Sequence, residues 1–289
     1  VTAVNGVAAF SDLGATNDAQ VDEAQLKFTS GGLAQITSGQ VTLPGPPPAP
    51  IDTQPATPTP SGVDIIVNGK VESAGIATTT QVDNRTITTI VVDEEKLQQR
   101  LEAEGNHAVV TIPVAGESNT VIGELNGRMI KNMENKQAVV EIKTEKATYT
   151  LPAQQINIDD ISELIGENVE LEDIKIRIEI AEPAEEMVQI VENAASDGGF
   201  AIAVPPLEFT IEGVYNDSRI EVTSFNVYVD RIVAIPEGVD PNRITTGVVV
   251  EPDGTVRHVP TKVVVVDGRY YAQINSLTNS TYTVVWNPL

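Results

Sequence analysis

Cysteine is absent from the chain of 289 residues, which also holds only two histidines and one tryptophan. The absence of cysteine excludes disulfides, thiolate nucleophiles and iron–sulfur clusters. His107 and His258 are the only histidines, so a metal site with several histidine ligands is nearly excluded. We therefore expect neither a cofactor nor a resident metal.

Basic residues are scarce as well, since 18 Lys and Arg stand against 41 Asp and Glu and give a formal net charge of −23. An acidic chain repels phosphate backbones, so nucleic acid is not an expected partner. No apolar run reaches the roughly 18 residues that a membrane-spanning helix needs, so a membrane is not an expected partner either.

Aromatic residues make up only 4% of the chain, although 41% of it is hydrophobic. The cores must therefore be built from Val, Ile, Leu and Ala, and the prominence of Val and Ile favours strands. The predicted fold class is mainly β with an α+β middle domain, in a multi-domain chain whose Ig-like or β-sandwich modules are joined by a proline-rich linker.

The proline-rich linker is predicted at residues 44–62, which hold eight of the 18 prolines. Proline fixes φ and lacks the N–H donor, so this stretch cannot join a helix or a central strand. An extended spacer of about 3.1 Å per residue would reach about 50 Å. A ligand for a proline-recognition domain is the alternative; we favour the spacer.

The segment before the linker, residues 1–43, alternates polar and apolar residues and breaks at Gly31-Gly32. This pattern predicts about three short strands, whereas an Ig-like sandwich needs about seven. We therefore interpret the segment as a partial Ig-like β segment: either a piece of the domain is missing, or its strands pair with something else.

Residues 63–205 are predicted to form an α+β domain. Strands are expected at Thr78–Val82 and Thr86–Val92, which pair with each other, and at Asp173–Ala181, where isoleucines alternate with charged residues. Apolar residues at helical spacing, with suitable end signals, predict helices at residues 93–105, 123–136, 157–166 and 183–195.

Residues 206–289 are predicted to form an all-β, sandwich-like domain with eight strands and no helix. The turns Asp253-Gly254 and Asp267-Gly268 each join two strand-like runs, which is a strong hairpin signal. Separate strands are expected at residues 219–229 and 231–235.

Several acidic residues and both histidines are candidate catalytic groups. A hydrolase would need two carboxylates facing one cleft, and adjacent acidic residues occur at Asp93-Glu94-Glu95, Asp159-Asp160 and Glu185-Glu186. Each group falls in the first turn of a predicted helix, where the helix dipole favours carboxylates, so we interpret them as capping residues. His107 and His258 could act as general bases, but neither has a Ser or Cys motif beside it. No catalytic residue, and no enzyme, is expected.

The acidic loop Asp12–Glu23 could hold Ca²⁺, but it lacks the alternating pattern of an EF-hand loop. Asn84, Asn216 and Asn279 each begin a glycosylation triplet, and they read most simply as turn residues. No metal-binding residue is therefore predicted.

Two stretches resemble known families. The runs Phe225–Arg231, Asp253–Thr261 and Ile274–Tyr282 resemble the region upstream of the surface-layer-homology (SLH) repeats in cell-surface proteins of Gram-positive bacilli of the Paenibacillus and Bacillus type. This resemblance covers about residues 63–289. It implies that SLH repeats would follow and bind cell-wall polymer, through residues that are not in this chain. Asn5–Leu13 and Leu26–Leu33 are similar to the last half of a bacterial Ig-like surface repeat.

These observations predict an extracellular structural protein of the cell surface or cell wall that assembles with copies of itself into a surface layer or filament. One route is donation of the N-terminal strands to a neighbouring subunit. A surface adhesin or carbohydrate-binding module is the alternative, and an extracellular hydrolase is the second alternative. We also expect the natural protein to extend beyond both ends of this chain.

Overall fold

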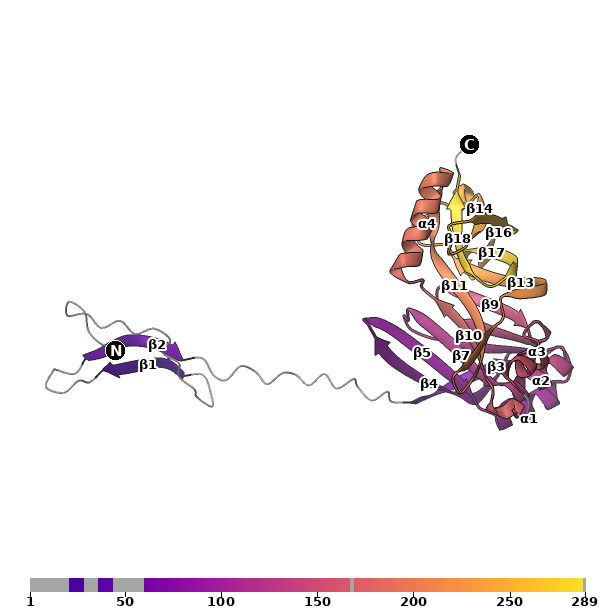
Figure 1. Cartoon of the computed structure of the whole chain (residues 1–289), viewed down its shortest axis with the longest axis horizontal. Helices are drawn as coiled ribbons and strands as arrows, with labels where there is room; N and C mark the ends of the chain where they lie inside the picture. The colour runs from indigo at the N-terminus through magenta and orange to yellow at the C-terminus, as the bar shows by residue number, and fades with distance from the viewer. Residues whose placement is uncertain (1–20, 29–35, 44–59, 167–168, 288–289) are drawn as a thin grey trace. The chain divides into compact units, whose positions relative to one another are not determined.

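The computed structural model describes residues 21–28, 36–43, 60–166 and 169–287. The chain divides into two compact units, Val1–Thr57 and Pro58–Leu289 (Figure 1). Most of the expected linker, residues 44–59, lies outside the described residues, as does the acidic loop up to Gln20.

The N-terminal unit contains an antiparallel pair, β1 (Val21–Phe28) and β2 (Ile36–Leu43). The alternating sequence predicted strands in both places, and these predictions are confirmed. The two strands form a two-stranded sheet, with register shifts between Val21 and Ala24 and between Gln25 and Lys27. A two-stranded hairpin is at best marginally stable by itself, so this sheet would gain stability from a further strand.

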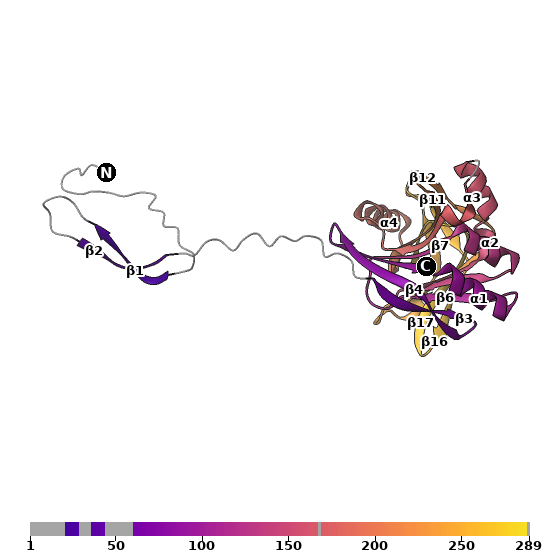
Figure 2. The ribbon, with the colours of Figure 1, turned by 90° about the horizontal axis from the view of Figure 1, so that it is seen from below.

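The C-terminal unit is built on one large mixed sheet, which confirms a mainly β fold (Figures 1 and 2). Its strands follow the order β15-β14-β18-β11-β10-β7-β5-β4-β3-β6-β8-β9-β13-β17-β16, and β12 pairs with β11. The strands are β3 (Ser61–Val67), β4 (Lys70–Val82), β5 (Arg85–Val92), β6 (Val109–Pro113), β7 (Thr120–Asn126), β8 (Val139–Lys143), β9 (Ala147–Pro152), β10 (Lys175–Ala181), β11 (Ala201–Tyr215), β12 (Ser218–Glu221), β13 (Ser224–Ala234), β14 (Thr246–Val250), β15 (Val256–Val259), β16 (Thr261–Val266), β17 (Arg269–Thr278) and β18 (Thr281–Trp286).

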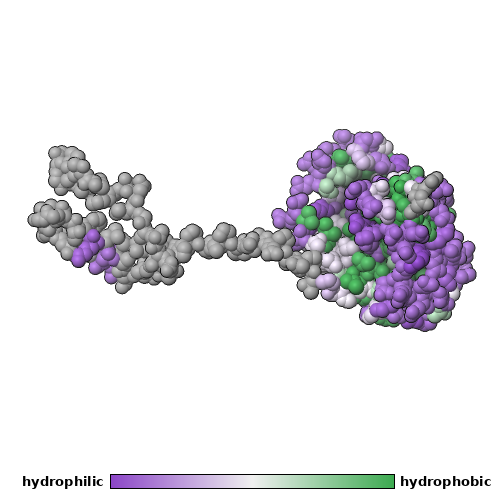
Figure 3. Space-filling model, turned by 60° about the horizontal axis from the view of Figure 1, so that its bottom comes forward, coloured by the Kyte–Doolittle hydropathy of each residue, from purple (hydrophilic) through white to green (hydrophobic). Residues whose placement is uncertain are grey.

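Four α-helices accompany this sheet in the described part of the unit: α1 (Glu94–Glu104), α2 (Gly127–Asn135), α3 (Ile158–Ile165) and α4 (Glu185–Gly198). The first three gather at one end of the unit, while α4 lies at the other end, beside β14 and β18 (Figure 1). Short 3₁₀ turns lie at Ala153–Gln155, Leu171–Asp173 and Pro241–Arg243. On the face shown in Figure 3, apolar residues form separate patches within a mostly polar surface.

The two ends of the sheet are joined through a single residue. β15 and β16 stand at opposite ends of the strand order, yet only Pro260 separates them in the chain. The Pro260 carbonyl accepts a hydrogen bond from the Asn275 amide at 2.9 Å, and the Gly247 amide donates to Thr261 Oγ1 at 2.8 Å. The sheet therefore folds back on itself and encloses the main apolar core.

The expected domain boundary between residues 205 and 206 falls inside a strand. Pro205 and Pro206 belong to β11, which pairs with β18 at one end and with β10 at the other. The register with β18 is interrupted between Val204 and Leu207. A proline lacks an N–H donor and is tolerated in a strand at such an interruption. These prolines thus mark a bulge, and residues on both sides of them share one sheet.

The helix predicted at 123–136 is wrong in its first turn. Gly123 and Leu125 belong to β7, which pairs with both β5 and β10. The helix α2 begins at Gly127, where Asn126 Oδ1 accepts a hydrogen bond from the Met129 amide at 2.8 Å. Pairing with strands distant in sequence overrides a local helical pattern.

The break predicted near residue 230 is also wrong, because β13 runs without interruption and Arg231 lies inside the core. Its guanidinium carbon lies 4.9, 5.2 and 4.5 Å from the ring centroids of Tyr149, Phe209 and Tyr282. It donates hydrogen bonds to three oxygens: Val229 O at 3.1 Å, Thr278 O at 2.8 Å and Asn279 Oδ1 at 2.9 Å. A buried cation is thus held by neutral acceptors and aromatic faces.

Replacing Arg231 with alanine should destabilise the unit by about 3 kcal/mol or more, because it leaves a cavity and unpaired buried acceptors. Arg231→Lys should cause an intermediate loss of stability, since an ammonium group lacks the planar hydrogen-bonding geometry of a guanidinium and does not stack on aromatic rings in the same way. Urea denaturation measures both effects. The control Arg269→Ala, at an exposed position, should stay within about 0.5 kcal/mol of wild type. Equal losses for Arg231→Ala and the control would contradict a supporting role for the guanidinium.

Candidate functional site

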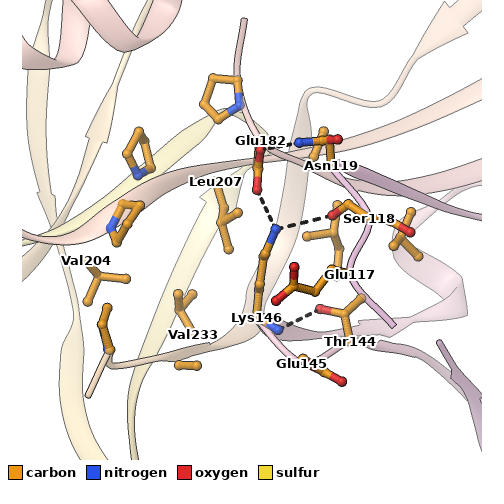
Figure 4. A pocket seen from close by; sticks show the side chains of 18 of the residues that line it. Glu117, Ser118, Asn119, Thr144, Glu145, Lys146, Glu182, Val204, Leu207 and Val233 are labelled. Carbon is orange, nitrogen blue, oxygen red and sulfur yellow. Dashed lines mark hydrogen bonds and ion pairs between the residues drawn. The ribbon is translucent and has the colours of Figure 1, made fainter. Parts of the chain in front are cut away.

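A pocket of about 700 Å³ opens in the C-terminal unit (Figure 4). It lies where several elements end: the loop before β7, the turn between β8 and β9, the end of β10, the start of α4, the bulge of β11 and the end of β13. One wall is apolar. The apolar lining residues are Val121, Ile180, Ala181, Pro183, Val188, Val204, Pro205, Pro206, Leu207, Val233, Ala234 and Pro236.

The polar centre of the pocket is an ion pair between Lys146 and Glu182. Lys146 Nζ donates to Glu182 Oε1 and, at 3.3 Å, to the carbonyl of Ser118. The second oxygen, Glu182 Oε2, accepts from Asn119 Nδ2 at 2.7 Å. Figure 4 shows Lys146 extended between Glu182 and Thr144, facing the wall formed by Val204, Leu207 and Val233.

Backbone contacts hold this ion pair in place. The Glu182 amide donates to the carbonyl of Asn119 at 2.7 Å, and the Lys146 carbonyl accepts from the Ala234 amide at 2.8 Å. From the β4–β5 hairpin, Arg85 donates to the carbonyls of Glu182 and Pro183. Five segments that are far apart in the chain are therefore tied together at the pocket.

The pKa of Glu182 lies below its ordinary value. Partial burial acts to raise it, but the hydrogen bonds from Lys146 and Asn119 and the charges of Lys146 and Arg85 outweigh burial. Glu182 is therefore ionised at neutral pH and neutralises Lys146.

The rim of the pocket is acidic. Glu117, Glu145 and Glu237 line it and are exposed, and no ion pair engages them within the described part of the chain. With Glu182, the lining holds four carboxylates and one ammonium group. The pocket therefore combines an apolar wall with an excess of negative charge.

Two carboxylates with raised pKa lie elsewhere, on the sheet face opposite the buried isoleucines of β10. Burial raises the pKa of Glu179 to about 7, helped by the charges of Glu208 and Glu212 and opposed by Arg177 and Arg85. Burial also raises the pKa of Glu208, together with the charge of Glu221. Neither Glu179 nor Glu208 lines the pocket.

The adjacent carboxylates found in the sequence lie at helix starts, as predicted. Asp93 Oδ1 accepts a hydrogen bond from the Lys96 amide at 3.0 Å and caps α1. Asp159-Asp160 and Glu185-Glu186 lie in the first turns of α3 and α4. None of these residues lines the pocket.

The two histidines lie apart from the pocket as well. His107 is exposed in a turn with φ of 62°, and its amide donates to the carbonyl of Lys136 at 2.8 Å. His258 is exposed on β15, opposite Val248. Neither contributes to the pocket lining.

The three asparagines of the glycosylation triplets differ. Asn84 and Asn216 have positive φ in tight hairpin turns, so their interpretation as turn residues is confirmed. Asn279 is buried and binds both Arg231 and the Tyr149 hydroxyl. The side-chain amide of Asn279 therefore has its hydrogen-bond partners inside the core and helps to stabilise it.

Sequence reasoning did not find the pocket, because its residues come from segments with no common motif or spacing. Within the described ranges, no group of three or more His, Asp or Glu side chains is placed to hold a metal ion. No helix of the described residues has the length and apolar character needed to cross a membrane. Comparison of the chain with family models, with curated proteins and with solved structures gave no match.

The raised pKa of Glu179 predicts a pH dependence of stability. Its folded-state pKa of about 7 exceeds the ordinary value of 4.5, so the folded state binds more protons between these values. The stability contributed by protonated Glu179 is fully present below about pH 4.5 and is lost as pH rises through about 7. Glu179→Gln should therefore raise the free energy of unfolding at pH 8 by on the order of 1–2 kcal/mol, with little change at pH 4.5.

Urea denaturation at the two pH values checks this expectation. Glu163→Gln on α3, where the carboxylate is exposed, is the control and should show no such difference. An equal effect of Glu179→Gln at both pH values would rule out the linkage.

Proposed function

We propose that this protein is a structural protein that assembles with copies of itself by strand addition to β16. The observation that carries the proposal is that β16 is an apolar edge strand. It pairs with β17 on one side, and no other described strand pairs with it. Figure 2 shows the β16–β17 hairpin at the margin of the C-terminal unit.

The edge is unusually apolar for a free strand. Val263, Val265 and Val266 are 37%, 58% and 41% exposed, and Tyr270 on the paired strand is 47% exposed. Soluble proteins usually protect such edges with charge, proline or a covering element. Lys262, the second residue of β16, is the only charged residue of this strand. An exposed strand of this kind is suited to pairing with another chain.

The other end of the sheet offers a contrast. β15 exposes Arg257 and His258 and is four residues long. Short strands with charged side chains resist edge-to-edge pairing. The two ends of the sheet therefore differ in the way expected if β16 alone receives a partner.

The proposed donor is the hairpin β1–β2 of another copy. Both strands have eight residues, enough to match the six of β16. A two-stranded sheet gains stability from a third strand. The proline-rich linker predicted at residues 44–62, whose last two residues, Ser61 and Gly62, begin β3, would act as an extended tether.

Donor and acceptor surfaces belong to different units, so the contact is heterologous. Heterologous contacts that do not close into a ring produce open polymers. A surface layer or filament at the cell exterior is consistent with this geometry and with the resemblance to regions that precede SLH repeats. The Ig-like nature of the first unit remains part of the same proposal.

Val265→Lys should abolish assembly while leaving a folded monomer, because it places a charge in the middle of the edge. Negative-stain electron microscopy and sedimentation velocity measure the outcome. Leu164→Lys is the matched control: it adds the same charge at an apolar side chain that is 67% exposed on α3. Polymers should persist in the control. Polymers of unchanged length in Val265→Lys would exclude β16 as the acceptor.

A mixing experiment separates donor from acceptor. Deletion of residues 1–57 removes the donor unit, whereas Val265→Lys blocks only the acceptor edge. Neither variant should polymerise alone, and an equimolar mixture should give discrete dimers. Polymers formed by the deletion variant alone would show that the donor is not the N-terminal unit.

A further inference from the structure

Strand addition at β16 leaves the pocket around Lys146 and Glu182 unexplained. We propose that this pocket is a binding site for a small organic cation with an apolar body. The inference rests on the shape, lining and charge of the pocket, and it does not depend on the proposed assembly.

The size and lining of the pocket suit a small molecule. Its volume of about 700 Å³ lies within the range of about 300–1,000 Å³ that small-molecule sites occupy. Val204, Leu207 and Val233 face the interior along one wall. Apolar ligand surface buried against such a wall contributes roughly 25 cal/mol per Å². An apolar body would therefore lie against the β11 bulge and the end of β13.

The charge of the pocket selects a cation. Lys146 is already engaged by Glu182 and by the Ser118 carbonyl, so its ammonium is not a free anchor for an anion. Glu117, Glu145 and Glu237 remain at the rim with their charges exposed. An anionic ligand would meet repulsion from three carboxylates, whereas a cationic group would be attracted to all three.

The pocket is also pre-formed. Contacts from Arg85, Asn119 and Ala234 fix the backbone on either side of the ion pair. A ligand would then lose little affinity to ordering of the protein. The rim glutamates take no part in these contacts, so they can be changed without disturbing the floor of the pocket.

Three probes of equal chain length test the charge selection on the full chain: octyltrimethylammonium, octanoate and octanol. Isothermal titration calorimetry should show one site for the cation, with affinity at least about tenfold higher than for the other two probes. Added salt should weaken cation binding, since the rim is exposed to solvent. Equal affinities for the cation and octanoate, or no binding of any probe, would overturn the proposal.

Substitutions at the rim test whether the cation binds in this pocket. Replacing the three rim glutamates, Glu117, Glu145 and Glu237, together with glutamine should lower the affinity for the cation by about tenfold. The control replaces Glu95, Glu102 and Glu163, which are exposed on α1 and α3, and should bind as wild type does. If both triple variants bind equally, the attraction comes from the overall charge of the protein, and the proposed site is wrong.

Filling the pocket gives an independent check. Val188 lines the pocket from α4 and is partly exposed, so Val188→Trp should block the cavity and abolish binding of the cation. Urea denaturation of the same variant confirms that it is folded. Unchanged binding by folded Val188→Trp would place the cation elsewhere on the protein.

Discussion

A single guanidinium, buried with no carboxylate partner among the described residues, joins the two halves of the C-terminal sheet. Arg231 on β13 reaches the turn between β17 and β18, where Thr278 and Asn279 accept its hydrogen bonds. The rings that surround it come from β9, β11 and β18. Burying a cation is costly unless it is hydrogen-bonded, so these contacts limit the movement of the strands relative to one another. The core of the unit is organised around that requirement.

The same sheet provides the pocket. β11 pairs with β18 from Ala201 to Glu208 and with β10 from Glu208 onward, and its pairing with β18 is interrupted at the Pro205-Pro206 bulge. Pro205 and Pro206 at this bulge line the pocket, together with the ion pair of Lys146 and Glu182. An irregularity of the sheet and a candidate binding site thus lie at the same place in the fold.

The proposals assign different surfaces to different tasks. The apolar β16 edge would connect copies of the protein, while the acidic pocket lined by the β11 bulge would hold a cation. The contrast between the charged β15 edge and the valine-rich β16 edge supports the first task. The pairing of Lys146 with Glu182 supports the second, because it leaves the rim carboxylates as the net charge.

Local signals in the sequence determined the β-rich class, the helix caps and the tight turns. Asp93 as a cap and Asp267-Gly268 as a hairpin turn depend on neighbours within a few residues, so they could be read from the chain. Tertiary structure alone decided that Gly123 belongs to a strand, that Arg231 is buried and that Pro205-Pro206 is a bulge. It also decided that Lys146 meets Glu182. Each of these features depends on partners far away in the chain. A hydrogen bond or ion pair between distant segments produces no local pattern of residues from which it could be predicted.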